Sequence, residues 1–141
     1  MGEEAAPSEG KLSSSSEDYL EAICQLACSG DSVRSVDLAN KLSVSKASVN
    51  KAVSILRRAG MVEQEHYGEI VLTEQGRGYG EKVLGRHRML TRFLVDILGV
   101  DPARASVEAC QMEHAISDDT MDRWIEFIKS CPLDSWLGSK L

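Results

Sequence analysis

The sequence predicts a mainly α-helical protein in which an N-terminal winged helix-turn-helix is followed by an α-helical domain. Three observations carry this prediction. Apolar residues recur at helical spacing in most segments between residues 16 and 128. Two of these segments are separated by only a few polar residues, as in a helix-turn-helix. Residues 61–73 instead place short apolar runs on either side of a Tyr-Gly turn, which is typical of a β-hairpin and therefore of a wing.

The composition is that of a globular protein. The chain has 141 residues, of which 43% are hydrophobic and 27% charged, so disorder is excluded for the bulk of it. This length suits one domain, or one small domain with a helical appendage. There is no apolar run long enough to span a bilayer, and the acidic Met-Gly-Glu-Glu start is unlike a signal peptide. We therefore expect a cytoplasmic protein with reduced cysteines.

The N-terminal segment changes character at residue 16. Residues 1–15 are rich in serine, glycine and glutamate and predict a flexible leader. From Ser16, which suits a helix N-cap, apolar residues recur at helical spacing as far as Cys28, where a Ser-Gly-Asp breaker follows. A first helix is expected over residues 16–28. Cys24, four residues before Cys28, is interpreted as a small core residue.

Residues 35–59 predict two short helices joined by a tight turn. Ser35 is expected to cap the first, which runs to Leu42, and Ser45 to cap the second and longer one, which Gly60 closes. With the hairpin that follows, these helices form a winged helix-turn-helix, and residues 16–74 are assigned to it.

A helical domain is expected over residues 75–141. A long amphipathic helix begins at Thr73 and runs to about Leu98, although its four glycines weaken it. A short turn or helix precedes two further helices, over residues 107–116 and 118–128. Their side chains provide more apolar surface than one small domain needs, so we expect them to be divided between a core and a dimer interface. The residues concerned are Leu94, Ile97, Leu98, Trp124, Phe127 and Ile128.

Charge is distributed unevenly along the chain. Sixteen basic residues against 22 acidic ones give a net charge of −6, which taken alone argues against a nucleic-acid partner. Residues 34–58, however, hold six basic residues and a single acid, Asp37, a local charge of +5 that leaves −11 for the rest of the chain. A basic helix-turn-helix on an acidic body presents one face to phosphates.

This basic segment and the hairpin together predict DNA binding. The second helix begins Ser-Lys-Ala-Ser-Val-Asn-Lys, whose small polar and cationic side chains suit a recognition helix in a major groove. The hairpin then acts as the wing, toward the backbone or the minor groove. A merely solvated basic helix is the alternative, and the elements around it argue against that alternative. The expected DNA-binding residues are Arg34, Ser45, Lys46, Ala47, Ser48, Asn50, Lys51, His66 and Tyr67.

Metal-ligating residue types occur at helical spacing in three places. Two carboxylates lie three residues apart on the first helix, a Cys-x-x-Glu-His run occupies little more than one turn, and a histidine lies on the long helix. Together they offer up to six ligands, enough for one octahedral ion or a pair of ions. Each group alone is also explained as a helix-dipole partner or a surface pair. The residues are Asp18, Glu21, His87, Cys110, Glu113 and His114.

Several stretches resemble the metal-dependent repressors that include the diphtheria toxin repressor and the manganese transport regulator. The resemblance runs from about Ser16 to Ile128. It implies a homodimeric winged-helix repressor that binds Mn(II) or Fe(II), one or two ions per subunit, and then a palindromic operator in front of metal-uptake genes. The motifs that carry it are EDYLEAI (17–23), VSKASV (44–49), GEIVLTEQG (68–76), Arg86-His87 and EACQMEHAISD (108–118).

By position, the resemblance implies a metal-ligand set of mixed type. The two carboxylates of the first helix match ligands of the manganese branch, while His87, Glu113 and His114 match ligands used across the family. Cys110 occupies a position that is a cysteine in the iron branch and a glutamate in the manganese branch. The hybrid set therefore leaves the choice between Mn(II) and Fe(II) open, because carboxylate and thiolate favour different ions.

Two further features of the family are expected to be missing. The ancillary metal site of the iron branch uses carboxylate and imidazole ligands, and those positions here are Thr91 and Ser106, so that site is lost or reduced. No SH3-like third domain is expected. The remaining ligands come from both predicted domains, so metal is expected to tie the domains together and to select a spacing of the two recognition helices that fits successive major grooves.

Two other classes of function compete with a metal-dependent regulator. An enzyme is disfavoured because the sequence has no glycine-rich phosphate loop and no His-Glu-x-x-His zinc motif. A redox-sensing winged-helix regulator remains the alternative, with Cys24, Cys28 or Cys110 as its switch.

Overall fold

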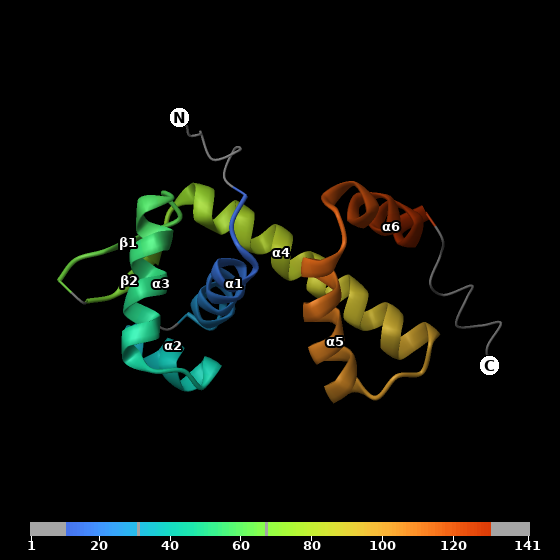
Figure 1. Cartoon of the computed structure of the whole chain (residues 1–141), viewed down its shortest axis with the longest axis horizontal. Helices are drawn as coiled ribbons and strands as arrows, with labels where there is room; N and C mark the ends of the chain where they lie inside the picture. The colour runs from blue at the N-terminus through green and yellow to red at the C-terminus, as the bar shows by residue number, and fades with distance from the viewer. Residues whose placement is uncertain (1–10, 31, 67, 131–141) are drawn as a thin grey trace. The chain divides into compact units, whose positions relative to one another are not determined.

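The protein is mainly helical. A computed structural model describes residues 11–30, 32–66 and 68–130. Its elements run in the order α1 (Ser14–Cys28), α2 (Ser35–Leu42), α3 (Lys46–Arg58), β1 (Val62–Gln64), β2 (Ile70–Leu72), α4 (Glu74–Arg92), the π-helix η2 (Phe93–Ile97), α5 (Pro102–Ala115) and α6 (Asp118–Ser130) (Figure 1). This order confirms the predicted fold class. No helix in the described ranges is long and apolar enough to cross a membrane.

The chain divides into two compact units, Met1–Val83 and Leu84–Leu141, with the boundary inside α4. The core of the first unit lies where α1, α2, α3 and the hairpin pack together. Its largest fully buried side chains are Leu20, Ile23, Leu38, Val49, Val53, Leu56, Met61 and Val62.

Helix α1 begins two residues earlier than the sequence predicted. Its N-cap is Ser13, whose hydroxyl accepts a hydrogen bond from the backbone N–H of Ser16 at 3.1 Å, so the prediction of Ser16 as the cap is wrong. Four consecutive serines can each cap, and the choice is made by Leu12, which is buried in the core and donates its N–H to the hydroxyl of Tyr79 at 2.9 Å. Tertiary packing therefore sets the start of the helix.

The two helices of the helix-turn-helix lie where the sequence placed them, with one change of cap. Arg34, not Ser35, is the N-cap of α2, and its backbone N–H donates to the carboxylate of Asp37 at 2.9 Å. Ser43 takes a left-handed conformation (φ 56°) that ends α2. Ser45 caps α3 as predicted, by accepting from the N–H of Ser48 at 3.1 Å.

The hairpin is the expected wing. Strands β1 and β2 pair antiparallel in the register Val62 to Leu72 and Gln64 to Ile70, and Ile70 also bridges to Val33. Tyr67, at the predicted turn, lies outside the described residues. The neighbouring His66 takes a positive φ of 48°, a conformation that non-glycine residues adopt mainly at turns.

Two of the four glycines in α4 are required by close packing. A Cβ at Gly76 would overlap the backbone carbonyl of Met61, and a Cβ at Gly80 would overlap the sulfur of Cys24. No such contact exists at Gly78, where nothing lies within 4 Å. The glycines that weaken this helix locally therefore allow it to approach the hairpin and α1.

The second unit has a separate small core. Its buried residues Leu90, Leu94, Ala105, Ala109 and Met121 come from α4, η2, α5 and α6. The edge of one ring meets the face of the other between Phe93 and Trp124, with centroids 5.6 Å apart and planes at 81°. Residues 102–115 form one helix, so the predicted division into a short element and a second helix from residue 107 is wrong: Asp101 caps it and Pro102 begins it.

The six apolar residues assigned to a shared core and dimer interface differ in burial, and Trp124 is half-buried against the core of the second unit. Leu94, Ile97 and Ile128 are buried, whereas Leu98 and Phe127 are 58% and 45% exposed. Leu98 and Phe127 are therefore the two large apolar side chains of this assigned set that remain open to solvent.

Candidate nucleic-acid interface and metal-ligand clusters

The N-termini of α2 and α3 meet at a notch, here named the α2–α3 notch. It has a volume of about 350 Å³ and is lined by Arg34, Ser35, Val36, Lys46 and Asn50. Because the free N–H groups of a helix start carry partial positive charge, two helix starts and two cations make this a favourable place for an anion. The structure thus brings together three of the predicted DNA-binding residues and adds Ser35, which sequence reasoning had used only as a cap.

The predicted DNA contacts on α3 are exposed. Lys46, Ala47, Ser48, Asn50 and Lys51 are open to solvent, whereas the intervening Val49 is buried in the core. The hydroxyls of Ser45 and Ser48 are hydrogen bonded to one another at 3.0 Å as part of the cap. The first two turns of α3 therefore present small and cationic side chains, as a recognition helix requires.

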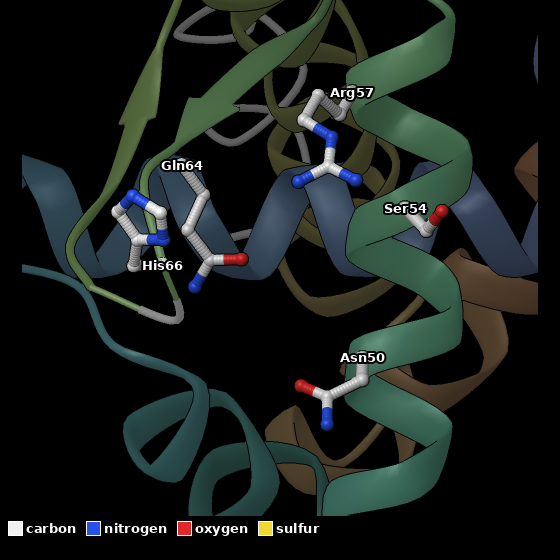
Figure 2. A pocket seen from close by; sticks show the side chains of 5 residues that line it. All are labelled: Asn50, Ser54, Arg57, Gln64 and His66. Carbon is white, nitrogen blue, oxygen red and sulfur yellow. The ribbon is translucent and has the colours of Figure 1, made fainter.

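A second notch lies between α3 and the hairpin and is here named the α3–hairpin notch. Figure 2 shows its five lining side chains, Asn50, Ser54 and Arg57 from α3, and Gln64 and His66 from the hairpin. Sequence reasoning had singled out only Asn50 and His66. The spacing of residues 50, 54 and 57, which places them on one face of a helix, was the available signal.

The carboxylates of Asp18 and Glu21 lie on α1, in the first unit. Glu21 is buried and Asp18 is half-buried. Taking a carboxylate out of water is costly unless a cation or hydrogen-bond donors compensate its charge. The burial of Glu21 therefore shows that this face of α1 is not simply exposed to solvent.

In the second unit, His87 of α4 faces Glu113 of α5. The imidazole Nδ1 lies 3.4 Å from Oε1 of Glu113, and the two side chains are 14% and 2% exposed. Within the described residues, neither oxygen of the Glu113 carboxylate accepts a hydrogen bond. A buried carboxylate without hydrogen-bond donors is destabilised unless a cation compensates its charge, and this arrangement fits a divalent metal ion.

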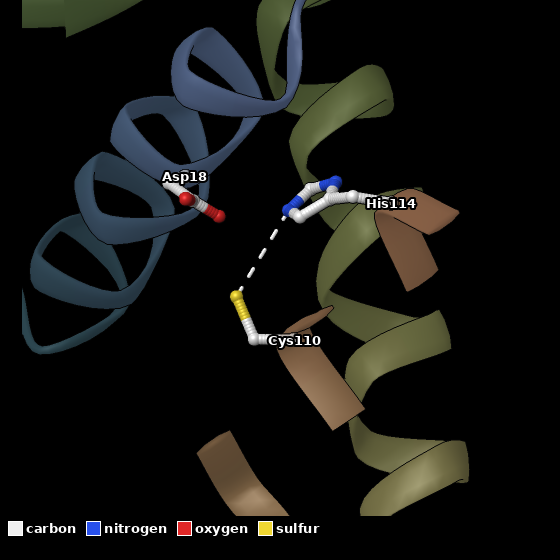
Figure 3. A group of neighbouring side chains, drawn as sticks. All are labelled: Asp18, Cys110 and His114. Atoms are coloured by element: carbon white, nitrogen blue, oxygen red, sulfur yellow. Dashed lines mark hydrogen bonds between the residues drawn. The ribbon is translucent and has the colours of Figure 1, made fainter. Parts of the chain in front are cut away.

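The other two candidate ligands of α5 form a second pair. Figure 3 shows the thiol of Cys110 and the imidazole of His114 on the same side of the helix, with Sγ and Nε2 3.9 Å apart. The structure therefore divides the Cys-x-x-Glu-His run, because Glu113 pairs with His87 while Cys110 pairs with His114. A thiol and an imidazole are ligands that Fe(II), Co(II) and Zn(II) accept.

The hydroxyls at the two ancillary positions both lie beside His87. Thr91 donates to the backbone carbonyl of His87 at 2.8 Å, and the hydroxyl of Ser106 lies 3.4 Å from Nε2 of the same residue. Such a contact to the ring nitrogen remote from Glu113 restrains the imidazole in the manner of an outer-shell group.

The cysteines bear on the redox alternative. Cys24 is 3% exposed, and burial raises the pKa of its thiol to about 11, with the nearby Cys28 thiol adding to the effect. At neutral pH Cys24 therefore does not supply the thiolate that a redox switch uses. Cys131, the fourth cysteine, lies outside the described residues.

Comparison with known proteins gives two matches that together cover most of the chain. Residues 11–70 match the N-terminal DNA binding domain of the iron dependent repressors, and residues 73–135 match their metal binding and dimerisation domain. The helix-turn-helix lies inside the first match, and the three clusters of metal-ligand types fall inside the two matches.

Individual relatives are named as regulators of transcription. The chain is 38% identical over 113 residues to an HTH-type transcriptional regulator of Methanocaldococcus jannaschii, and this match covers 79% of the chain and 90% of the relative. It is 32% identical over 111 residues to transcriptional regulator MntR of Salmonella typhimurium, covering 79% and 70%. The iron-dependent repressor IdeR of Mycobacterium tuberculosis is 30% identical over 131 residues, covering 93% and 56%.

Solved structures show the same fold. The IdeR of T. acidophilum matches with a TM-score of 0.67 and 27% identity, and the manganese regulator SloR with a TM-score of 0.70 and 27% identity. The matches cover 80% and 81% of this chain but 53% of each solved chain, so this chain spans about half the length of either.

Proposed function

The chain belongs to the iron-dependent repressor family of metal-dependent transcriptional repressors, and on that premise we propose that it is a Mn(II)- or Fe(II)-activated repressor of metal-uptake genes. It acts in the cytoplasm as a homodimer on a palindromic operator and has no catalytic role. Residues 16–74 form its DNA-binding domain, and residues 75–141 its metal-binding and dimerisation domain.

The metal part of this proposal rests on one observation above all, the buried carboxylate of Glu113. It faces the imidazole of His87 across 3.4 Å and accepts no hydrogen bond from the described residues. Oxygen and nitrogen donors side by side in a largely dry setting suit a divalent transition metal ion.

The proposed ligand set combines hard and soft donors. Carboxylates favour Mn(II) or Fe(II), whereas the thiol of Cys110 favours Fe(II) over Mn(II). One or two ions per subunit are compatible with six donors. The complete set is Asp18, Glu21, His87, Cys110, Glu113 and His114.

The mechanism follows from where the donors and the DNA-binding residues lie in the sequence. When bound, a divalent ion would supply the positive charge that compensates the carboxylates of this ligand set. Asp18 and Glu21 belong to α1, which packs on α3 in the core of the first unit, so their position is coupled to that of the recognition helix. We propose that ligand binding by α1 restricts the spacings that the two α3 helices of a dimer adopt, in favour of the spacing of successive major grooves.

The DNA part rests on the exposed basic start of α3 and on the α2–α3 notch. Lys46 and Arg34 bring two cations to the point where two helix starts meet. Asn50, Lys51 and the wing residue His66 extend this surface along α3 and the hairpin. Small side chains such as Ala47 let the helix approach base edges closely.

The test is an anaerobic metal titration read by DNA binding. A duplex operator is first selected from a random library with metal-loaded protein, and its binding is followed by fluorescence anisotropy as Mn(II) or Fe(II) is added. We expect tight binding only with metal, and reversal by a chelator. Operator binding that a chelator leaves unchanged would contradict the proposal.

A matched pair of variants ties the titration to the proposed ligands. Glu113→Gln removes a buried carboxylate of the set, whereas Glu108→Gln removes an exposed carboxylate from the same helix. The first variant should need at least tenfold more metal for half-maximal DNA binding, and the second should respond like the parent protein. Equal metal dependence of both variants would exclude Glu113 as a ligand.

A further inference from the structure

The α3–hairpin notch is a polar hollow of about 400 Å³ that the recognition helix and the wing build together. Asn50, Ser54 and Arg57 lie along one face of α3, and Gln64 and His66 face them from the hairpin (Figure 2). All five side chains are polar. The lining contains one permanent cation, the guanidinium of Arg57, and no acidic side chain.

The hairpin side of the notch is held in place by its own hydrogen bonds. The carboxamide of Gln64 donates to the backbone carbonyl of Gly68 at 2.9 Å, and the N–H of Gly68 donates to the carbonyl of Glu65 at 2.7 Å. A Cβ at Gly68 would approach that carbonyl to 2.8 Å, so the turn requires a residue without a side chain. A short hairpin fixed in this way presents Gln64 and His66 without a large loss of conformational freedom on binding.

The acidic residues of the hairpin lie away from the notch. Glu63 precedes Gln64 in β1, and because alternate residues of a strand point to opposite faces, Gln64 lines the notch while Glu63 does not. Glu65 and Glu69 are also exposed and absent from the lining. The hairpin is therefore acidic in composition but lines the notch with the uncharged carboxamide of Gln64 and the imidazole of His66.

This donor set identifies the ligand by its chemistry. A guanidinium, a hydroxyl, two carboxamides and an imidazole can all donate hydrogen bonds, and a guanidinium pairs well with phosphate oxygens. Base edges are read mainly by the N-terminal residues of a recognition helix, whereas Arg57 lies in the last turn of α3, beside the wing. The position suits the DNA backbone rather than the bases.

We infer that the α3–hairpin notch binds a backbone phosphate of duplex DNA, with Arg57 as its charged partner and Gln64 and His66 as further hydrogen-bonding groups from the wing. This inference rests on the proposed DNA-binding function. It assigns to Ser54 and Gln64 a role that the sequence did not indicate, and to Arg57, one of the six basic residues of the segment 34–58, a specific site. The volume of the α3–hairpin notch leaves room for a phosphate together with bridging water.

The test compares two single-charge variants in DNA binding by the full chain. Arg57→Gln removes the cation of the notch, and Lys82→Gln removes an exposed cation from α4, so both variants lower the net charge equally. Each metal-loaded protein is titrated with the selected operator duplex and with a scrambled duplex of the same composition. Thermal denaturation establishes that the variants are folded.

We expect Arg57→Gln to weaken binding of both duplexes by the same factor, about tenfold, and to reduce the slope of log K against log salt by about 1. Lys82→Gln should change affinity less than twofold. Equal effects of the two variants would overturn the inference, and so would a loss confined to the operator duplex, because that pattern indicates a base contact. Failure of the parent protein to bind either duplex with metal would instead count against the proposed function.

A second measurement identifies the phosphate itself. Single phosphates of the operator are replaced in turn by uncharged methylphosphonates, and each duplex is titrated with the parent protein and with Arg57→Gln. One phosphate should be costly to neutralise for the parent and nearly neutral for the variant, as in a double-mutant cycle. If every phosphate behaves identically with both proteins, the notch does not bind the backbone.

Discussion

Replacing Glu113 by glutamine should stabilise the metal-free protein. The carboxylate is 2% exposed and accepts no hydrogen bond within the described residues, and its Oε1 lies 3.4 Å from Nδ1 of the His87 imidazole. A carboxylate in such a setting carries a desolvation penalty that an isosteric neutral amide largely avoids. We expect the free energy of unfolding of the apo protein to rise by about 1–3 kcal/mol, because an unsatisfied buried charge costs more than the unsatisfied neutral amide that replaces it.

The same change should abolish most of the stabilisation by metal. An ion present at a hundred times its dissociation constant stabilises the folded protein by about 2.7 kcal/mol, and this gain shrinks as the affinity falls. For a unit of this size, 1 kcal/mol corresponds to a shift of roughly 4–8 °C in the midpoint of thermal unfolding. Glu113→Gln should therefore melt at a higher temperature than the parent protein in chelator, and gain less on addition of Mn(II).

The assay is thermal unfolding under anaerobic conditions, followed by circular dichroism with chelator and with Mn(II) or Fe(II). Glu108→Gln is the control, because it removes an exposed carboxylate from the same helix. If apo Glu113→Gln melts below the parent protein, the carboxylate is already satisfied without metal, and the reasoning from its burial is refuted.

Two further predictions concern the first unit. Gly80→Ala should lower the free energy of unfolding by about 1–3 kcal/mol, because its Cβ would overlap the sulfur of Cys24. Gly78→Ala should raise the free energy of unfolding by about 0.5–1 kcal/mol, because alanine favours the helix and nothing lies within 4 Å of its Cβ. Equal melting temperatures of the two variants would contradict this packing. The raised pKa of Cys24, about 11 in the folded protein against 9.0 for an ordinary thiol, means that unfolding releases a proton above pH 9. That contribution to stability is complete below pH 9 and is lost as the pH rises through 11, by about 2–3 kcal/mol in all. The free energies of unfolding of the parent protein and of Cys24→Ala, measured with denaturant, should therefore diverge over this pH range. If they change in parallel, the thiol ionises equally in the folded and unfolded states.

Local pattern was sufficient to predict the helix-turn-helix and the wing. The serine before α3, the apolar face of that helix and the break after Gly60 are short-range signals, and each acts within a few residues. The start of α1 was not predictable in this way. Any of four serines could cap it, and the burial of Leu12 against residues far along the chain decided which one did.

The helical unit shows a similar division. Its long helix was predicted as one continuous amphipathic segment, but the structure has α4 continuing into a π-helix at Phe93. The predicted break before residue 107 was wrong, because Asp101 and Pro102 start a helix that continues to Ala115. Periodicity alone cannot separate one helix from two when small residues such as Ala105 are buried in it.

The candidate sites were likewise predictable in part from the sequence. Sequence by itself identified the donor types and the basic segment, because residue chemistry and helical spacing can be read without knowing the fold. Only the tertiary structure decided that Glu113 pairs with His87 and Cys110 with His114, and that Arg57 shares a notch with Gln64. The pairs His87–Glu113 and Arg57–Gln64 join residues on different elements. Such pairs and their burial arise only when the elements pack against one another, so no local pattern in the chain encodes these two pairs.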